Sequence, residues 1–231
     1  MSTAKIDELI ELLKLNPEAE VLDIACGKGE MLTRLAEHYT ITGVGVDISP
    51  FAVANAKQKL QERVPNGQIE ILNMDGADYK SDKPFDVTMC IGASWIYKGH
   101  QGTLRAMKSM TKAGGLILVG EPFWIKEPVE AYLVAIGHTR DEFGSHYTNL
   151  LAGKEENLIP LYTVVSSQDD WDHYETLQWY AATKFAEENE NDPDVPEILN
   201  RVAQGQTNYL RWGRDTLGWA IYLFKNATHI L

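Results

Sequence analysis

Short apolar segments alternate with amphipathic segments through the first 125 residues, and this alternation constrains the fold more than any other feature. The apolar segments have the length of buried strands, and most are followed by apolar residues at helical spacing. Strands that alternate with helices predict a parallel sheet with helices on both faces. Five strands are expected in this part of the chain, at residues 19–25, 41–49, 68–74, 85–92 and 116–121.

The second half of the chain has a different pattern. Residues 126–160 are expected to be helical and irregular, and further strands are expected at 161–167 and 219–227. An aromatic-rich helical insert at about 169–216 separates these last two strands. A length of 231 residues indicates one domain. We therefore expect a core at about residues 1–125 with helical additions at 126–160 and 169–216.

Charge and composition exclude several functional classes. The net charge of −12 disfavours binding to nucleic acid or to an anionic membrane, since phosphate-binding surfaces need clustered Lys and Arg. Two cysteines fit a reducing compartment rather than a disulfide framework. The first residues lack a signal-peptide pattern, and no apolar run reaches the length of a membrane span. The sequence predicts an acidic cytoplasmic protein.

Small residues form the corner between the first strand and the helix after it, in the stretch "DIACGKGE". Glycines at such a corner let the backbone approach a ligand, and the start of the helix offers free N–H groups. Asp47 ends the second strand and Asp75 follows the third. The carboxyl ends of parallel strands share one edge of a sheet, so these acids predict an adenosine-like ligand there.

A dinucleotide motif needs a third glycine, but the two possible positions for it hold Glu30 and Leu32. A nicotinamide oxidoreductase is therefore disfavoured. The form D-x-A-x-G-x-G resembles motif I of class I S-adenosylmethionine-dependent methyltransferases, with Ala25 in place of the usual first glycine. The resemblance continues through "VGVDIS", "NMDGADY", "FDVTMCIGASWIY" and "MTKAGGLILVGEPFW", and covers about residues 20–125.

The segments "GASWIYKG", "GEPFW", "DWDHYETLQW" and "GWAIYLF" extend the likeness to a group of uncharacterised bacterial small-molecule methyltransferases. The resemblance implies a Rossmann-like α/β fold, with a seven-stranded sheet in the order 3-2-1-4-5-7-6. It also implies that strand 7 is antiparallel and that a helical insert precedes it.

The resemblance further implies a cofactor site for S-adenosyl-L-methionine, with S-adenosyl-L-homocysteine as product. Asp23 would hold the methionine amino group, and Asp47 would bind the ribose hydroxyls. Asp75 would accept from the adenine amino group. A methyl group at Ala25 would be tolerated where φ is negative. The cofactor-binding residues expected are Asp23, Ala25, Gly27, Gly29, Asp47, Ile48, Asp75, Gly76 and Ile91.

Aromatic and titratable residues follow strands four and five, where the methyl acceptor would bind. Trp95, Tyr97 and Trp124 are expected to contact the acceptor, since aromatic walls hold flat or cationic groups. His100 and Glu121 are the candidate catalytic bases. Two alternatives stay open: the tryptophans pack under the insert, or Glu121 pairs with a cation such as Arg214.

The insert between the last two strands supplies three further candidates for acceptor contact, namely Trp171, Tyr174 and Arg214. Helical spacing puts Trp171 and Tyr174 on one face together with Leu177 and Gln178. The insert is expected to cover the acceptor pocket, and a homodimer surface or a packed appendage are the alternatives. No metal site is expected.

The function expected is methyl transfer to a small-molecule nitrogen, oxygen or sulfur acceptor by in-line displacement in an aromatic-lined pocket. The cofactor carries the reactive group, so the protein needs only to align the acceptor, exclude water and remove a proton. The alternative is a non-catalytic sensor or partner subunit that binds S-adenosylmethionine. Neither nucleic acid nor membrane is expected as a partner.

Overall fold

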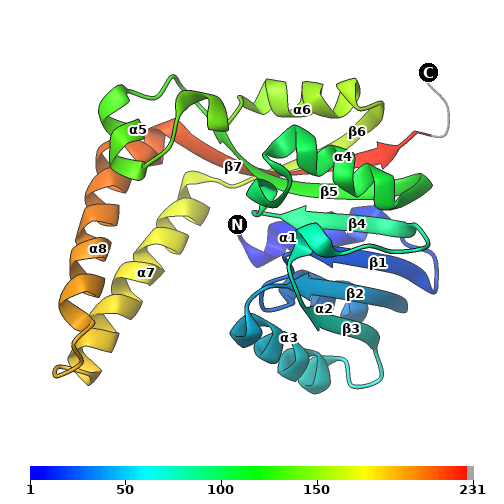
Figure 1. Ribbon diagram of the computed structural model, residues 1–231, viewed down its shortest axis with the longest axis horizontal. Helices are drawn as coiled ribbons and strands as arrows, with labels where there is room; N and C mark the ends of the chain where they lie inside the picture. Colours follow the sequence, from blue (N-terminus) through cyan, green and yellow to red (C-terminus); the bar gives the residue numbers. More distant parts are fainter. Residues whose placement is uncertain (228–231) are drawn as a thin grey trace. The chain divides into compact units, whose positions relative to one another are not determined.

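Seven strands form one sheet in the order β3-β2-β1-β4-β5-β7-β6 (Figure 1). The structure is a computed structural model that describes residues 1–227. The order is the one that the resemblance implied, so this prediction is confirmed. The strands are β1 (Ala19–Ile24), β2 (Ile41–Asp47), β3 (Gln68–Asn73), β4 (Phe85–Ile91), β5 (Thr111–Trp124), β6 (Leu158–Val165) and β7 (Leu217–Asn226).

The first five strands in the chain are parallel, so their carboxyl ends lie at one edge of the sheet. Strand β1 pairs with β2 on one side and with β4 on the other, and Asp23 is opposite Gly45 and Met89. Strand β2 pairs with β3 so that Asp47 is opposite Asn73. Strand β7 runs against β5, which makes the sheet mixed (Figure 1).

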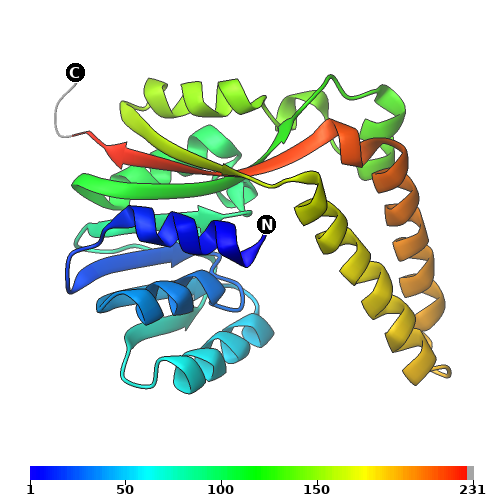
Figure 2. The same ribbon diagram turned by 180° about the vertical axis from the view of Figure 1, so that it is seen from behind.

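Helices cover both faces of this sheet. Helices α1, α2 and α3 lie on one face (Figure 2), and α4 and α6 lie on the other (Figure 1). The pair Ser49-Pro50 is a sequence signal for the start of a helix, and α3 begins there: the Ser49 side chain accepts from the backbone N–H of Ala52 and Pro50 is the first helical residue. These helices are α1 (Thr3–Leu13), α2 (Glu30–His38), α3 (Pro50–Arg63), α4 (His100–Met110) and α6 (His146–Glu155).

Strand β5 begins five residues earlier than the sequence indicated. The segment "LRAMKSMTKAGG" before the expected strand has the pattern of a helix that ends at its glycine pair, and the structure corrects this interpretation. Helix α4 ends at Met110, and β5 starts at Thr111 opposite Phe85. The register then jumps, because the next pair joins Val87 to Leu116. The intervening residues form a bulge, where Gly114 has φ +80°. The glycines belong to a strand irregularity and not to a helix cap.

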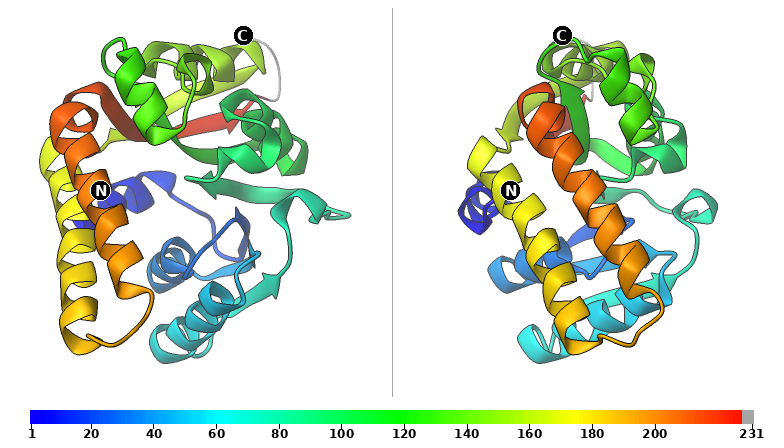
Figure 3. Two further views of the ribbon diagram at one scale, coloured as in Figure 1. Left: turned by 60° about the vertical axis from the view of Figure 1, so that its left-hand side comes forward. Right: turned by 90° about the vertical axis from the view of Figure 1, so that its left-hand side faces the viewer.

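The chain divides into two compact units, which we describe separately. The sheet unit contains residues 3–121, 146–164 and 220–227, and the helical unit contains residues 1–2, 122–145 and 165–219. Helices α7 and α8 of the helical unit form an antiparallel hairpin (Figure 3). The helical unit holds α5 (Glu130–Ile136), α7 (Gln168–Glu188), α8 (Val195–Asn208), a π-helical turn (Tyr209–Gly213) and α9 (Arg214–Thr216).

The helical unit has an aromatic core of its own. Trp124, Tyr132 and Leu133 are buried there, and Phe143 and Trp212 pack against them. The ring of Trp124 meets Phe143 and Tyr132 edge to face, at centroid distances of 5.3 and 6.4 Å. The end of β5 therefore supplies a core residue of the helical unit.

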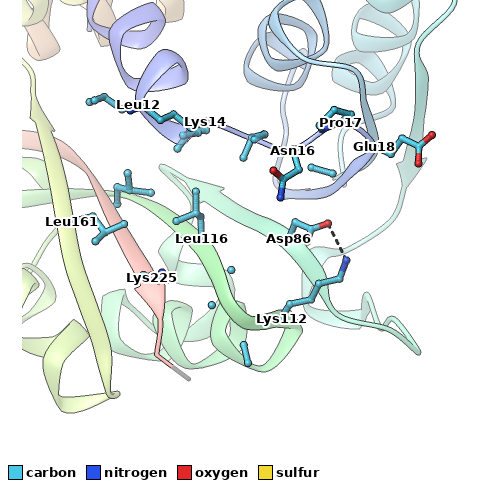
Figure 4. Close-up of a pocket in the computed structure, with 17 residues that line it drawn as sticks. Leu12, Lys14, Asn16, Pro17, Glu18, Asp86, Lys112, Leu116, Leu161 and Lys225 are labelled. Atoms are coloured by element: carbon cyan, nitrogen blue, oxygen red, sulfur yellow. Dashed lines mark hydrogen bonds and ion pairs between the residues drawn. The ribbon is translucent and has the colours of Figure 1, made fainter. Parts of the chain in front are cut away.

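A hollow of about 610 Å³ lies at the amino edge of the sheet, away from the carboxyl ends of the parallel strands (Figure 4). Lys112 forms an ion pair with Asp86 at 2.9 Å beside it. Leucines and lysines share its lining, namely Leu12, Leu116, Leu161, Lys14, Lys112 and Lys225. Within residues 1–227, no helix has both the length and the apolar character needed to cross a membrane.

Candidate cofactor-binding site

The corner after β1 is held by backbone bonds to the neighbouring strand. The Cys26 N–H donates to the carbonyl of Val46 at 3.0 Å, and the Gly29 N–H donates back to the carbonyl of Cys26 at 2.9 Å. Both glycines of the corner have left-handed backbone, with φ +55° at Gly27 and +68° at Gly29. This conformation explains why glycine occupies the two positions.

The two glycines differ in what surrounds them. A Cβ atom at Gly29 would lie 2.9 Å from the Cβ of Ala56, so close packing between α2 and α3 requires the small residue. A Cβ atom at Gly27 would meet no protein atom within 4 Å. Protein packing therefore does not demand the bare backbone at Gly27. Its open side is a cradle for a ligand.

Ala25 stands where the family pattern has its first glycine. Its φ is +58°, so the third residue of this corner is also left-handed, although it carries a methyl group. The condition under which a methyl group would be tolerated here, a negative φ, is therefore not met. A left-handed alanine costs about 1–2 kcal/mol. The chain keeps this strain at the corner where backbone would approach a ligand, as is common at functional sites.

Asp47 joins the corner to the second strand. One carboxylate oxygen accepts from the Gly27 N–H at 2.8 Å, and the other accepts from the Ser49 N–H at 2.9 Å. Each oxygen keeps a further lone pair, so the carboxylate can still accept bonds from ribose hydroxyls. Asp47 therefore positions the glycine corner as well as facing a ligand, a second role that sequence reasoning missed.

Asp23 is buried at the end of β1, and no cation of the described residues offsets its charge when it ionises. Burial and, to a lesser extent, the negative charge of Asp47 raise the pKa of Asp23 to about 8. A cation placed beside Asp23 would reverse this effect by favouring the ionised form. The carboxyl is therefore suited to an ammonium group, which the methionine part of S-adenosylmethionine carries.

The loop after β3 carries the adenine-side residues. The Asp75 carboxylate accepts from the Ala77 N–H at 2.9 Å and caps a short 3₁₀ turn, Gly76–Asp78. A Cβ atom at Gly76 would lie 2.6 Å from Ile24, so glycine is needed here for packing. The Ile48 side chain is 67% exposed, which leaves its apolar surface open to a flat ligand such as adenine. Ile91 is half-buried at the end of β4.

Glu30 occupies the place where a dinucleotide site has its third glycine. The carboxylate binds Arg34 of its own helix and Lys59 and Arg63 of α3, at 2.6–3.1 Å. These partners bring the pKa of Glu30 down to about 2, although burial opposes them. The acid therefore stays ionised at the start of α2 and links the two helices.

Several predicted acceptor contacts have other roles in the sheet unit. Tyr97 lies in the 3₁₀ turn Ser94–Tyr97, and its hydroxyl donates to the carbonyl of Gly76 at 2.9 Å. Tyr97 thus holds the adenine-side loop. Trp95, in the same turn, is 74% exposed and free to contact a ligand. The sequence placed both residues together, but the structure gives them different tasks.

Both candidate bases belong to the sheet unit, where Glu121 is buried and His100 is half-buried. His100 starts α4, and its Nε2 lies 3.0 Å from the carbonyl oxygen of Asn149. Burial lowers the pKa of His100 to about 4. Glu121, at 1% exposure, hydrogen-bonds Ser94, and burial raises its pKa to about 7. Ser94 is a site residue that sequence reasoning missed, and its position three residues after β4 was the available signal.

The remaining acceptor candidates lie in the helical unit. The buried Trp124 donates its indole N–H to the carbonyl of Arg140 at 2.9 Å, which favours the packing role left open by the sequence. Arg214 pairs with Asp172 through two bonds of 2.9 Å, and not with Glu121 as one alternative held. The Tyr209 hydroxyl also donates to Asp172, at 2.7 Å.

Helix α7 presents a different face inward from the one that spacing suggested. Trp171, Glu175 and Trp179 are half-buried and Ala182 is buried, so residues four and three apart define the packed face. Tyr174 is exposed, as are Leu177 and Gln178. Trp171 meets Tyr174 edge to face at 6.1 Å. Trp171 and Tyr174 therefore do lie side by side, as their spacing predicted, but the packed face of α7 is a different one.

Comparison with known proteins agrees with this geometry. Residues 21–115 match the family described as a methyltransferase domain. A solved SAM-dependent methyltransferase from Thiobacillus denitrificans, in complex with S-adenosyl-L-homocysteine, is 32% identical; the match covers 97% of this chain and 91% of that one, with a TM-score of 0.89. The chain belongs to the SAM-dependent methyltransferases.

Two further relatives of this methyltransferase match over most of their length. The SAM-dependent methyltransferase from Geobacter sulfurreducens, also in complex with S-adenosyl-L-homocysteine, is 29% identical, with a TM-score of 0.91 over 97% of this chain and 91% of that one. The uncharacterized protein YjhP of Escherichia coli (strain K12) is 29% identical over 94% of this chain and 89% of its own. The family's cofactor, S-adenosylmethionine, fits the open side of Gly27 and the buried acid Asp23.

Proposed function

We propose that this methyltransferase modifies a small-molecule acceptor at nitrogen, oxygen or sulfur, beside the carboxyl ends of β4 and β5. The observation that carries the proposal is the pairing of an open glycine cradle at Gly27 with an uncompensated buried acid at Asp23. Together they suit a ligand that is cationic at one end and adenosine-like at the other. S-adenosylmethionine supplies an electrophilic methyl group when bound.

The protein's own residues would bind the cofactor and orient the acceptor. Asp23 would hold an ammonium, Gly27 would offer bare backbone, and Asp47 would accept from ribose hydroxyls. Trp95 offers an exposed ring beside this edge for a flat or cationic acceptor. The net charge of −12 supports a small molecule over nucleic acid, because a polyanion would be repelled.

Calorimetry with S-adenosylhomocysteine and transfer of a labelled methyl group test the proposal in two stages. We expect tight binding of S-adenosylhomocysteine by the full chain and labelling of a compound of low molecular mass in a metabolite extract. A Gly27→Ala variant should bind S-adenosylhomocysteine more weakly. Gly137→Ala is its matched control, since both glycines are left-handed and face open space but Gly137 follows α5 of the helical unit. Label that enters only protein or nucleic acid would contradict the proposal.

A further inference from the structure

One buried carboxyl at the carboxyl edge of the sheet has no positive partner. Glu121 is the last residue of β5 within the sheet unit, and its Oε2 atom is buried without a hydrogen-bond partner among residues 1–227. Its bond is to the side chain of Ser94. Burying an ionised carboxylate is costly unless a cation or several donors accompany it. The free oxygen therefore marks a position where a ligand group is missing.

The titratable groups around Glu121 are neutral near pH 7. Its charge acts on Cys90 of β4 and Tyr222 of β7, and burial raises the pKa of each to about 12. His100 of α4 and His146 of α6 pack against the Tyr222 ring, and burial lowers the pKa of both. No cation of the described chain compensates this acid.

Glu121 also lies at the carboxyl edge of the sheet. It follows Gly120, which is opposite Ile91 at the end of β4, and β4 lies between β5 and the strand of Asp23, β1. Trp95 directly follows Ser94, the hydrogen-bond partner of Glu121, and its exposed ring offers a cation–π surface. A carboxylate and an exposed indole together suit a small organic cation.

We infer that the methyl acceptor is a small amine and that the free oxygen of Glu121 receives the proton that this amine loses. The inference rests on the proposed function and names its substrate class. The amine arrives as an ammonium ion and supplies the missing positive charge. A carboxylate acceptor would bring a second negative charge to the same place, and a thiol or hydroxyl would bring no positive charge.

The proton and electron pairs balance without a further reactant. One N–H proton of the ammonium passes to Oε2 of Glu121, which leaves the nitrogen lone pair free. That lone pair forms the N–C bond to the transferred methyl carbon, and the pair of the broken C–S bond stays on sulfur. Glu121 later releases its proton to water. A base works best when its pKa is close to the working pH, and the burial of Glu121 provides this match.

The structure also distinguishes between the two candidate bases, His100 and Glu121, which the sequence left open. His100 has one nitrogen at the Asn149 carbonyl, and its Nδ1 is buried without a partner in the described part of the chain. The ring is thus fixed within the sheet–helix interface beside Tyr222. Glu121 keeps a free oxygen at the end of a strand that leads to the site. We therefore assign proton transfer to Glu121.

The test compares Glu121→Gln with the wild-type full chain on panels of methyl acceptors. Labelled methyl transfer is measured with separate panels of small amines, thiols, phenols and carboxylic acids. We expect label in the amines, and a kcat/KM that falls about 100-fold or more in Glu121→Gln. Calorimetry should show that Glu121→Gln binds S-adenosylhomocysteine with unchanged affinity. In the presence of S-adenosylhomocysteine, this variant should bind the amine that the wild type methylates more weakly than the wild type does. Glu175→Gln, a half-buried carboxyl of the helical unit, is the matched control that should retain activity.

A pH profile distinguishes a base from a structural acid. The kcat/KM of the wild type should rise through about pH 7, and Glu121→Gln should lack this limb. Ser94→Ala should move the limb to higher pH, because the Ser94 hydrogen bond lowers the pKa of Glu121. Label confined to thiols, phenols or acids would overturn the amine inference and leave the methyltransferase intact. Failure to bind S-adenosylhomocysteine would instead refute the proposed function.

Discussion

Asp23 should make the ligand-free protein less stable as the pH rises, and replacing it should remove this loss. The folded-state pKa of Asp23 is about 8, against 3.8 for the unperturbed group. The folded protein therefore keeps a proton that the unfolded chain releases between these two values. Because the folded pKa is raised, stability is fully present below pH 3.8 and is lost as the pH rises toward 8.

The size of the effect follows from this window. Between the unperturbed pKa of 3.8 and pH 7 lie about 3 pH units. At 1.36 kcal/mol per unit, the free energy of unfolding falls by about 4 kcal/mol over this range. Asp23→Asn cannot titrate, so its stability relative to the wild type should rise by about 4 kcal/mol between pH 4 and pH 7. Other buried acids, such as Glu121, titrate equally in both proteins and cancel in the difference.

Urea unfolding at a series of pH values measures this difference. The same variant should bind S-adenosylhomocysteine at least ten-fold more weakly, because it cannot pair with an ammonium. Calorimetry in buffers of different ionisation enthalpy should show that the wild type releases about one proton on binding at pH 7, and that Asp23→Asn releases none. If the stability difference between the two proteins changes by less than 1 kcal/mol between pH 4 and pH 7, the raised pKa of Asp23 is refuted.

Three further substitutions test the backbone and the packing. Ala25→Gly should raise the free energy of unfolding by about 0.5–1 kcal/mol in urea, because relief of the left-handed strain exceeds the entropy that glycine adds to the unfolded chain; a loss would contradict the strain. Gly27→Ala should weaken S-adenosylhomocysteine binding at least ten-fold by calorimetry, whereas Gly137→Ala, which introduces the same left-handed strain elsewhere, should leave it unchanged; equal affinities would exclude a ligand at Gly27. Gly153→Ala should lower the free energy of unfolding by about 1–3 kcal/mol in urea, because the new methyl would lie 2.2 Å from the Phe224 ring, and an unchanged value would contradict that contact.

The strand–helix alternation and the cofactor edge could be predicted because local pattern determines them, whereas the order of the strands came from the resemblance to the methyltransferase family. Buried apolar runs define β1, β2 and β4, and an acid at or just after the end of each of three strands must come to one edge when the strands are parallel. Ser49 and Pro50 define the start of α3 by capping chemistry that needs no tertiary contact. These features depend on neighbours within a few residues, so sequence alone carries them.

Features that depend on distant contacts could not be predicted. The left-handed Ala25 is imposed by the corner around it, and nothing in an alanine signals it. Trp124 and Trp95 look equivalent in sequence, yet one is in a core and the other is exposed. The inward face of α7 was misjudged because tryptophans and tyrosines occur on several sides of this helix. The ion-pair partner of Arg214 is an aspartate 42 residues earlier in the chain, and sequence reasoning could not predict this pair either.

The ion pairs of Glu30 affect which ligands the fold can evolve to accept. A phosphate group at the N-terminus of α2 would lie beside the fixed carboxylate of Glu30. Repulsion from this charge disfavours the binding of molecules that carry a pyrophosphate, although the helix N-terminus offers free amides. Removing this acid alone would leave Lys59 and Arg63 without their shared counter-ion. Conversion of this scaffold to a dinucleotide enzyme would therefore require coordinated changes on two helices, which a single mutational step does not provide.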